Sequence, residues 1–134
     1  MGLGEAVIVA GLGCRKGVSA AEVESALEAA LAHNRLSPQQ LKRIAVPALK
    51  GNEAGIIAAA AARGVLPTLI AQVALEAASP HTLTRSARSM EAMNVHSVAE
   101  AAALAGAGPN ARLLAPRIAV GSVTCALAEG DNGS

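Results

Sequence analysis

The sequence predicts a single three-layer α/β/α domain, in which helices cover both faces of a mostly parallel mixed sheet and a C-terminal antiparallel hairpin completes that sheet. Short β-rich apolar runs alternate with amphipathic helical segments along most of the chain, an order typical of a parallel sheet. Two strand candidates near the C-terminus are only a few residues apart, too close for a helical crossover, so they should pair antiparallel. A length of 134 residues fits one domain.

The first predicted strand–helix unit opens the chain. Residues 6–12 are an apolar, β-rich run that predicts a buried strand. Ser19 and Glu22 have the spacing of a capping box, in which each residue satisfies a backbone amide of the other. The helix that follows should end near residues 33–34 and bury one apolar face, composed of Val23, Ala26, Leu27, Ala30 and Leu31.

A second unit follows after one predicted helical turn at residues 37–40. Residues 43–46 predict a strand closed by Pro47. The next helix should end at residues 63–64, before a weaker third strand at residues 67–71. Its inward face should be formed by Ile56, Ile57, Ala60 and Ala61.

The second half is less regular. Residues 73–95 predict a short helical piece and then a long mobile loop. Ser97 and Glu100 repeat the capping signature and begin a last helix, which should end near Gly106. The hairpin strands are expected at residues 112–115 and 122–127.

The domain is expected to span residues 1–128, and residues 129–134 are expected to be a polar, disordered tail. No apolar run approaches the ~20 residues that span a bilayer, and the N-terminus lacks the pattern of a secretory leader. We therefore expect a cytoplasmic protein that does not bind membranes.

The composition narrows the classes of ligand. A net charge of +1 is too balanced for the positive field of a nucleic-acid-binding protein, and the absence of Phe, Tyr and Trp removes aromatic stacking. The two cysteines, Cys14 and Cys125, are expected to be free thiols. His33, His81 and His96 are isolated, so no metal-ligand spacing occurs, and no cofactor is expected.

The sharpest prediction from the residues is an anion site in the loop after the first strand. In an open α/β sheet, ligands bind beyond the carboxyl ends of the parallel strands. This loop combines exposed amides, two cations and a helix N-terminus, which together attract carboxylate or phosphate oxygens; its residues are Gly11, Gly13, Cys14, Arg15, Lys16, Gly17 and Ser19. The alternative is a tight turn whose glycines only permit positive φ and whose cations are solvated.

Three residues are candidates for catalysis. Cys14 lies beside Arg15 and before a helix N-terminus, an environment that lowers a thiol pKa, although a small residue filling a turn explains it as well. Glu53, near Lys50, is a candidate base, and His96 is a candidate acid or base. Glu53 and Glu100 each begin a helix, where capping and the helix dipole explain a carboxylate; capping is the default for Glu100, whereas Glu53, next to Lys50, is the better candidate for function.

Four segments of the sequence resemble the CobE family and the C-terminal domain of CbiG, both of cobalamin biosynthesis. The sequence GLGCRKGVS at residues 11–19 is similar to the family's opening motif. Three further blocks follow in the family's order: residues 50–55, 95–104 and 122–128. Asn52 stands where the family often has Asp, and Asn94 stands where Gly is usual.

The resemblance implies a protein of cobalamin biosynthesis, of the standalone type found in the aerobic pathway, that binds or acts on a corrin-ring intermediate of precorrin or hydrogenobyrinic-acid type. The acetate and propionate groups of such a ring would suit the cations of the first loop and Lys50. Glu53 and Ser97 complete the candidate ligand-binding residues. Two alternatives stay open: a hydrolase of a precorrin-5A-like lactone, as in CbiG, and a subunit that docks on another enzyme of the pathway.

Overall fold

Six strands form one mixed sheet in the computed structural model, which describes residues 6–87, 90–91 and 95–131. The parallel strands are β1 (Ala6–Cys14), β2 (Leu41–Pro47) and β3 (Pro67–Ile70), in the order β3-β2-β1. Beyond β1, the long strand β6 (Val123–Asp131) runs antiparallel and pairs with β4 (Arg112–Leu113) and β5 (Ile118–Val120). The predicted mixed α/β class is confirmed.

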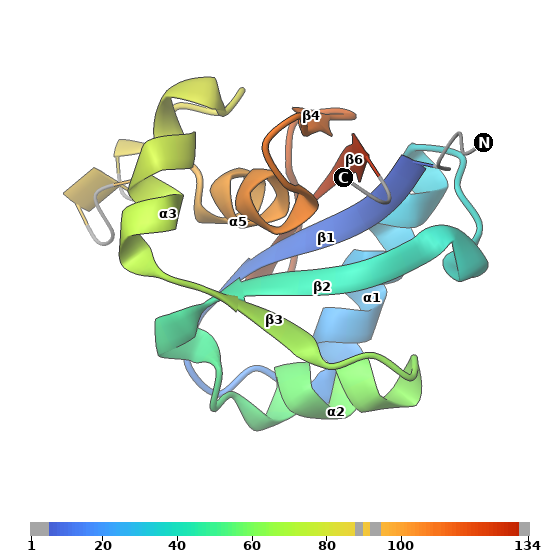
Figure 1. Cartoon of the computed structure of the whole chain (residues 1–134). Coiled ribbons are helices and arrows are strands. Elements are labelled where there is room, and N and C mark those ends of the chain that lie inside the picture. The colour runs from blue at the N-terminus through green and yellow to red at the C-terminus, as the bar shows by residue number, and fades with distance from the viewer. Residues whose placement is uncertain (1–5, 88–89, 92–94, 132–134) are drawn as a thin grey trace.

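Helices cover both faces of this sheet (Figure 1). One face packs against α1 (Ala20–His33) and α2 (Ala54–Ala62), and the other against α3 (Gln72–Ala78) and α5 (Val98–Ala107). Short 3-10 turns complete the connections: η1 (Pro38–Gln40), η2 (Ala48–Lys50) and η3 (Ser79–His81). The strands β1, β2 and β3 therefore all end at one edge, where the loops to α1, α2 and α3 begin.

Helix α1 begins and packs as the sequence predicts. The Ser19 hydroxyl accepts a hydrogen bond from the Glu22 amide at 3.1 Å, and the Glu22 carboxylate accepts one from the Ser19 amide at 3.1 Å. The predicted apolar face is the buried face. The capping box fixes where the loop after β1 turns into the helix.

Helix α5 lies unusually close to the sheet. A Cβ placed on Gly11 of β1 would come within 2.0 Å of the Ala99 carbonyl oxygen, and one on Gly130 of β6 within 2.0 Å of the Ala107 carbonyl oxygen. Nearly every residue of α5 is buried, including Glu100. Only glycine on the sheet and alanine on the helix permit this approach, which brings the first turn of α5 next to the end of β1.

The buried face of α2 differs from the prediction. Gly55, Ile56, Ala59 and Ala60 are buried, whereas Ile57 and Ala61 are exposed. A Cβ on Gly55 would lie 2.3 Å from the Val18 carbonyl oxygen, so this glycine lets α2 approach the loop before α1. That approach sets the rotation of the helix, and helical periodicity alone does not reveal it.

The C-terminal part also differs in detail. The predicted strand at residues 112–115 is shorter, and the tight hairpin is made by β5, which the sequence reasoning missed, through Gly121 at φ 60°. The expected tail is wrong in its start, because Glu129 to Asp131 belong to β6 and pair with the beginning of β1. Residues 132–134 of that tail lie outside the described residues.

The segment at residues 73–95 is partly helical. It contains most of α3 and all of η3, and residues 87, 90 and 91 are helical as well. Residues 88–89 and 92–94, within the loop expected to be mobile, lie outside the part of the chain that the structure describes.

Candidate functional site

The loops after β1 and β2 meet at the carboxyl edge of the sheet. Glu53, the residue before α2, accepts a hydrogen bond from the Gly17 amide through Oε1 at 2.9 Å. Lys50 and Glu53 both lie near enough to Cys14 for their charges to change the pKa of its thiol. The structure therefore brings together Cys14, Gly17, Lys50 and Glu53, four candidate residues from two segments far apart in sequence.

The two cations of the first loop point to solvent. Arg15 and Lys16 are exposed, and the backbone of Arg15 is held by a hydrogen bond from its amide to the Ser122 carbonyl oxygen at 3.3 Å. Gly17 has φ 82°, and a Cβ added to it would meet no atom within 4 Å, so its role is the turn itself. The ion pairs found among the described residues join Arg63 to Glu24 and Arg112 to Glu129. Neither involves Arg15 or Lys16, so both of these charges remain available to an anion.

Two polar groups expected to bind an anion, one of them a backbone amide, are already engaged. The Gly17 amide is bonded to Glu53, and the Ser19 hydroxyl serves the helix cap. Gly11 is buried beneath α5, and a Cβ on Gly13 would meet the Thr124 hydroxyl at 2.7 Å. These residues have structural roles in this conformation, so recognition of an anion here would rely on the exposed side chains of Arg15 and Lys16.

Cys14 does not have the environment expected of a nucleophile. Burial raises the pKa of its thiol above the ordinary value, and the negative charge of Glu53 adds to that increase, while the positive charge of Lys50 opposes it. The expectation of a lowered pKa is therefore wrong, because the thiol packs against the core below α1 and burial has the largest effect. Cys125 is buried within the sheet, and burial raises its pKa to about 12.

Ser97 and His96 lie on the other face of the sheet, at the beginning of α5. Ser97 is fully buried and caps the helix by accepting a hydrogen bond from the Glu100 amide at 3.4 Å. The His96 backbone is fixed by Ser79 and Ser86, and its Nδ1 is buried without a hydrogen-bond partner among the described residues. No hydrogen bond in that part of the chain joins His96 to Cys14 or Glu53, so the three catalytic candidates do not form one constellation.

Glu100 is the residue whose role the sequence did not reveal. Its side chain is 0% exposed, and its carboxylate accepts hydrogen bonds from the Thr84 hydroxyl at 2.6 Å, from the amides of Thr84 and Arg117, each at 2.9 Å, and from the Leu83 amide. Burial acts to raise the pKa of Glu100, but the hydrogen bonds together lower it by more than burial raises it. The pKa of Glu100 is therefore below its ordinary value. Glu100 thus joins the segment after η3 and the segment before β5 to α5.

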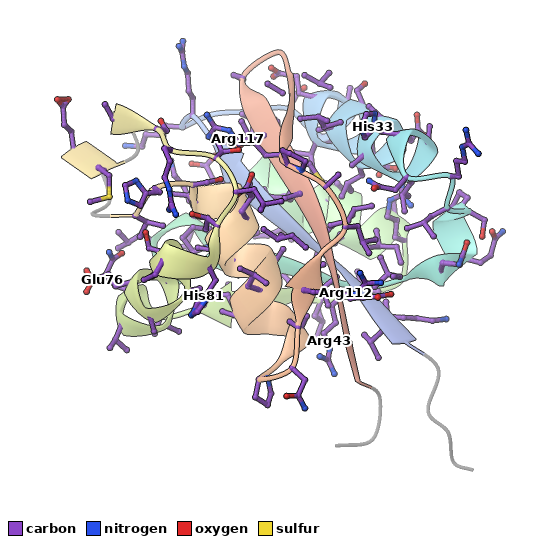
Figure 2. All side chains as sticks on the ribbon, turned by 90° about the horizontal axis from the view of Figure 1, so that it is seen from above. His33, Arg43, Glu76, His81, Arg112 and Arg117 are labelled. Carbon is purple, nitrogen blue, oxygen red and sulfur yellow. The ribbon has the colours of Figure 1, made fainter. Side chains whose placement is uncertain are left out.

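Arg117 is a further cation that sequence reasoning missed. Its amide is bonded to Glu100, and it directly precedes Ile118, which pairs with Cys125 at the level of Leu12 in the sheet. Figure 2 shows Arg117 toward the end where β1 finishes, far from Arg43 and Arg112 at the opposite end of α5. The hydrogen bond to Glu100 and the pairing of Ile118 with Cys125 place it there, and no sequence motif marks it.

Two open cavities in the described part of the molecule lie away from the carboxyl edge. One, of about 720 Å³, lies between α3 and the end of α5; it is lined mainly by alanine and leucine, and His81 and Arg112 also line it. The other, of about 680 Å³, lies beside the end of α1 and the beginning of β2. Neither contains a residue that the sequence singled out for function.

Metal-binding clusters and membrane-spanning helices are both absent from residues 6–87, 90–91 and 95–131. Within that range, no three His, Cys, Asp or Glu side chains are grouped so that they could hold a metal ion. None of the helices there combines the length and apolar character needed to cross a membrane.

The chain belongs to the family described as cobalamin synthesis G C-terminus, CbiG_C, whose sequence pattern matches residues 8–128. It is a cobalamin biosynthesis protein of the CobE and CbiG type, which confirms the resemblance found in the motifs. Protein CobE of Sinorhizobium sp is 35% identical over 121 residues, which are 90% of this chain and 79% of that protein.

Solved structures agree. The crystal structure of CobE, a protein from the cobalamin (vitamin B12) biosynthetic pathway, has a TM-score of 0.89 at 32% identity and covers 96% of this chain and 94% of its own. Cobalamin biosynthesis protein chiG from Agrobacterium tumefaciens str. C58 has a TM-score of 0.75 at 40% identity, covering 94% and 100%. A cobalamin biosynthesis protein G homolog from Sulfolobus solfataricus shares the fold at 21% identity, and this chain spans 37% of it.

Proposed function

We propose that this protein binds a corrin-ring intermediate of precorrin or hydrogenobyrinic-acid type at the carboxyl edge of its sheet. The observation that carries the proposal is the position of Arg15, Lys16 and Lys50 on two adjoining loops, while the glutamates nearby are hydrogen-bonded to backbone amides. The similarity to CobE, which belongs to the standalone type, favours the aerobic pathway.

The chemistry of such a ligand suits side-chain cations. Corrin precursors carry several carboxylates around a large, mostly apolar ring, and charge-assisted hydrogen bonds to Arg and Lys are the strong way to hold carboxylates. Arg117 extends the cationic surface to the α5 side of the sheet. A ring placed over the end of β1 would meet cations on both sides.

Binding is favoured over catalysis by the state of the candidate catalytic groups. The Cys14 thiol has a raised pKa, and His96 lies on the other face of the sheet from the Glu53 segment. A hydrolase of a precorrin lactone remains the second candidate, because the half-buried Glu53 carboxylate lies among cations that could stabilise an oxyanion. In that case Glu53→Gln would abolish turnover and retain binding.

The test is a titration with hydrogenobyrinic acid and with earlier precorrins, followed by the visible spectrum of the ring. We expect Arg15→Ala with Lys16→Ala to weaken binding at least about tenfold, because two charged contacts to carboxylates are lost. Lys42→Ala with Arg43→Ala is the matched control. It also removes one Lys and one Arg, but from the start of β2, the end away from the proposed site, and it should leave the affinity unchanged.

Each result has a definite meaning. Equal weakening in the two double variants would show a general charge effect and would contradict the proposed location. Binding by no precorrin at all would overturn the proposal and favour the docking-subunit alternative. A time-dependent change in the spectrum that Glu53→Gln removes would instead support the hydrolase.

A further inference from the structure

The buried carboxylate of Glu100 is connected to the cationic surface through the backbone amide of Arg117. Residues 114–117 join β4 to β5 and lie outside the strand pairing. Pro116 has no amide hydrogen to donate, so the Arg117 amide, bonded to Glu100 at 2.9 Å, anchors the end of this segment on α5. The position of Arg117 therefore depends on the pairing of β5 and on a residue that is itself 0% exposed.

The guanidinium of Arg117 is available to a ligand. Arg117 is half-buried, and neither ion pair among the described residues includes it. The Glu100 carboxylate is satisfied without the guanidinium, because its four hydrogen bonds come from three backbone amides and one hydroxyl. Val120 lies at the level of Cys14 in the sheet, and Arg117 precedes it by three residues, which is about 10 Å along a strand. A large ring with carboxylate arms could therefore contact both Arg15 and Arg117.

We propose that Arg117 binds a carboxylate of the ligand on the α5 side of the sheet, and that Glu100 is the positioning residue that sets where its guanidinium lies. This inference rests on the proposed function and adds to it a buried residue that controls affinity without touching the ligand. A guanidinium that is held in place before the ligand arrives loses less entropy on binding. It can also donate two parallel hydrogen bonds to one carboxylate.

A glutamine at position 100 separates the effect of position from the effect of charge. The amides of Leu83 and Thr84, which donate to Oε1, cannot accept a hydrogen bond, whereas the Thr84 hydroxyl at Oε2 can reverse and accept one. The side-chain nitrogen of Glu100→Gln should therefore turn toward this hydroxyl and leave the Arg117 amide unpaired. By charge alone, the loss of a nearby negative group should strengthen the binding of an anion. The loss of the anchor should weaken that binding, so the two explanations predict opposite signs.

The test is a titration with hydrogenobyrinic acid, applied to Arg117→Ala and to Glu100→Gln. Each should raise the dissociation constant about fivefold or more, because one charge-assisted contact is lost or misplaced. In the Arg117→Ala background, Glu100→Gln should have no further effect on affinity, because Glu100 acts through Arg117. Arg112→Ala is the matched control: it removes the same charge from the opposite end of α5 and should leave the dissociation constant unchanged.

Two further variants separate positioning from a loss of stability. Thr84→Val removes a hydrogen bond to the same carboxylate oxygen without touching the Arg117 amide, so it should leave the affinity unchanged. Glu100→Asp keeps the charge but shortens the side chain by one methylene, and it should weaken binding as Glu100→Gln does. Circular dichroism at the temperature of the titration shows which variants are folded.

The outcomes distinguish this inference from the proposed function. A wild-type chain that binds neither hydrogenobyrinic acid nor a precorrin overturns both. If Arg15→Ala with Lys16→Ala weakens binding but Arg117→Ala does not, this inference alone is overturned. Unchanged or stronger binding by folded Glu100→Gln or Glu100→Asp overturns the positioning role of Glu100.

Discussion

At the scale of single residues, burial decides which polar groups are available for chemistry. Glu100 is buried and Cys14 is partly buried, but Glu100 receives four hydrogen bonds that stabilise its charge, whereas burial raises the pKa of the Cys14 thiol. A charged carboxylate that is satisfied in this way holds structure together, and a partly buried neutral thiol fills space. The two residues therefore belong to the framework of the carboxyl edge in the conformation described.

Replacing Glu100 tests the structural role of its carboxylate. We expect Glu100→Gln to reduce the free energy of unfolding by about 2–4 kcal/mol, because the amide nitrogen faces donors and leaves buried groups unpaired. Thr84→Val, which removes only the contact at 2.6 Å, should reduce it by about 1 kcal/mol. Urea denaturation at neutral pH measures both. Equal stability of Glu100→Gln and the wild type would contradict this role.

The pH dependence of stability follows from the same residue. The pKa of Glu100 is lower in the folded state than in the unfolded chain, so its contribution is fully present above the unfolded pKa and is lost as the pH falls through the folded pKa. The stability of the wild type should therefore decrease more steeply on acidification than that of Glu100→Gln. Denaturation midpoints measured between neutral pH and about pH 3 check this.

The reactivity of Cys14 tests the geometry of the two loops. Because the charge of Glu53 raises the pKa of the thiol and that of Lys50 lowers it, Glu53→Gln should lower the pKa and Lys50→Ala should raise it. The pH dependence of alkylation by iodoacetamide measures both changes, with Cys125→Ser as the background so that only one thiol remains. Identical profiles in the two variants would show that the loops do not meet.

At the scale of elements, the sequence predicted those whose pattern is local. The capping box of α1 and its apolar face are both found where expected, and so are the positions of β1 and β2. Strand β5 was missed because three residues are too few to show a period. The predicted buried face of α2 was wrong because a long-range contact at Gly55 sets the rotation of the helix.

The candidate site shows the same division. Its motif residues Cys14, Lys50 and Glu53 are close together, as expected of loops at the carboxyl ends of neighbouring parallel strands. The partners of Glu100 lie 16 to 17 residues away in segments without periodicity, so neither spacing nor composition indicates them. Arg117 could not be placed for the same reason.

The contact between α5 and β1 is sensitive to a single methyl group. Gly11→Ala should cost about 3 kcal/mol or more, because the added Cβ would meet backbone atoms of α5 that cannot rotate away. Gly51→Ala is the control, because the atoms within less than 3.3 Å of its added Cβ all belong to the flexible end of the Leu69 side chain. This substitution should reduce the free energy of unfolding by less than about 1 kcal/mol. Thermal or urea unfolding distinguishes the two.

At the scale of the whole molecule, the pairing of β1 with β6 joins the beginning of the described chain to its end. Ala6 is opposite Asp131, Val7 opposite Gly130 and Ile8 opposite Glu129. The pairing of β1 with β6 lies in the middle of the sheet, beside the pairing of β1 with β2. The residues expected to form a tail therefore help to hold the framework on which the carboxyl-edge loops rest.

Truncation tests that conclusion. A chain that ends at Ala128 loses these three pairs and the ion pair of Arg112 with Glu129. We expect it to unfold about 2–3 kcal/mol more easily, with a Tm roughly 10 °C lower than that of a chain ending at Asp131. Circular dichroism during heating measures the difference. An unchanged Tm would show that residues 129–131 do not contribute to the stability of the fold.

The opposition of Ala6 and Asp131 also makes the chain a candidate for circular permutation. A short linker could connect these neighbouring positions, and new ends could be opened at the exposed turn after α2, at Gly64. Ala6 and Asp131 lie at the start of β1, whereas the loops after β1 and β2 begin at the other end of these strands. A label or surface anchor attached next to Ala6 or Asp131 would thus leave the cationic edge facing away from the attachment.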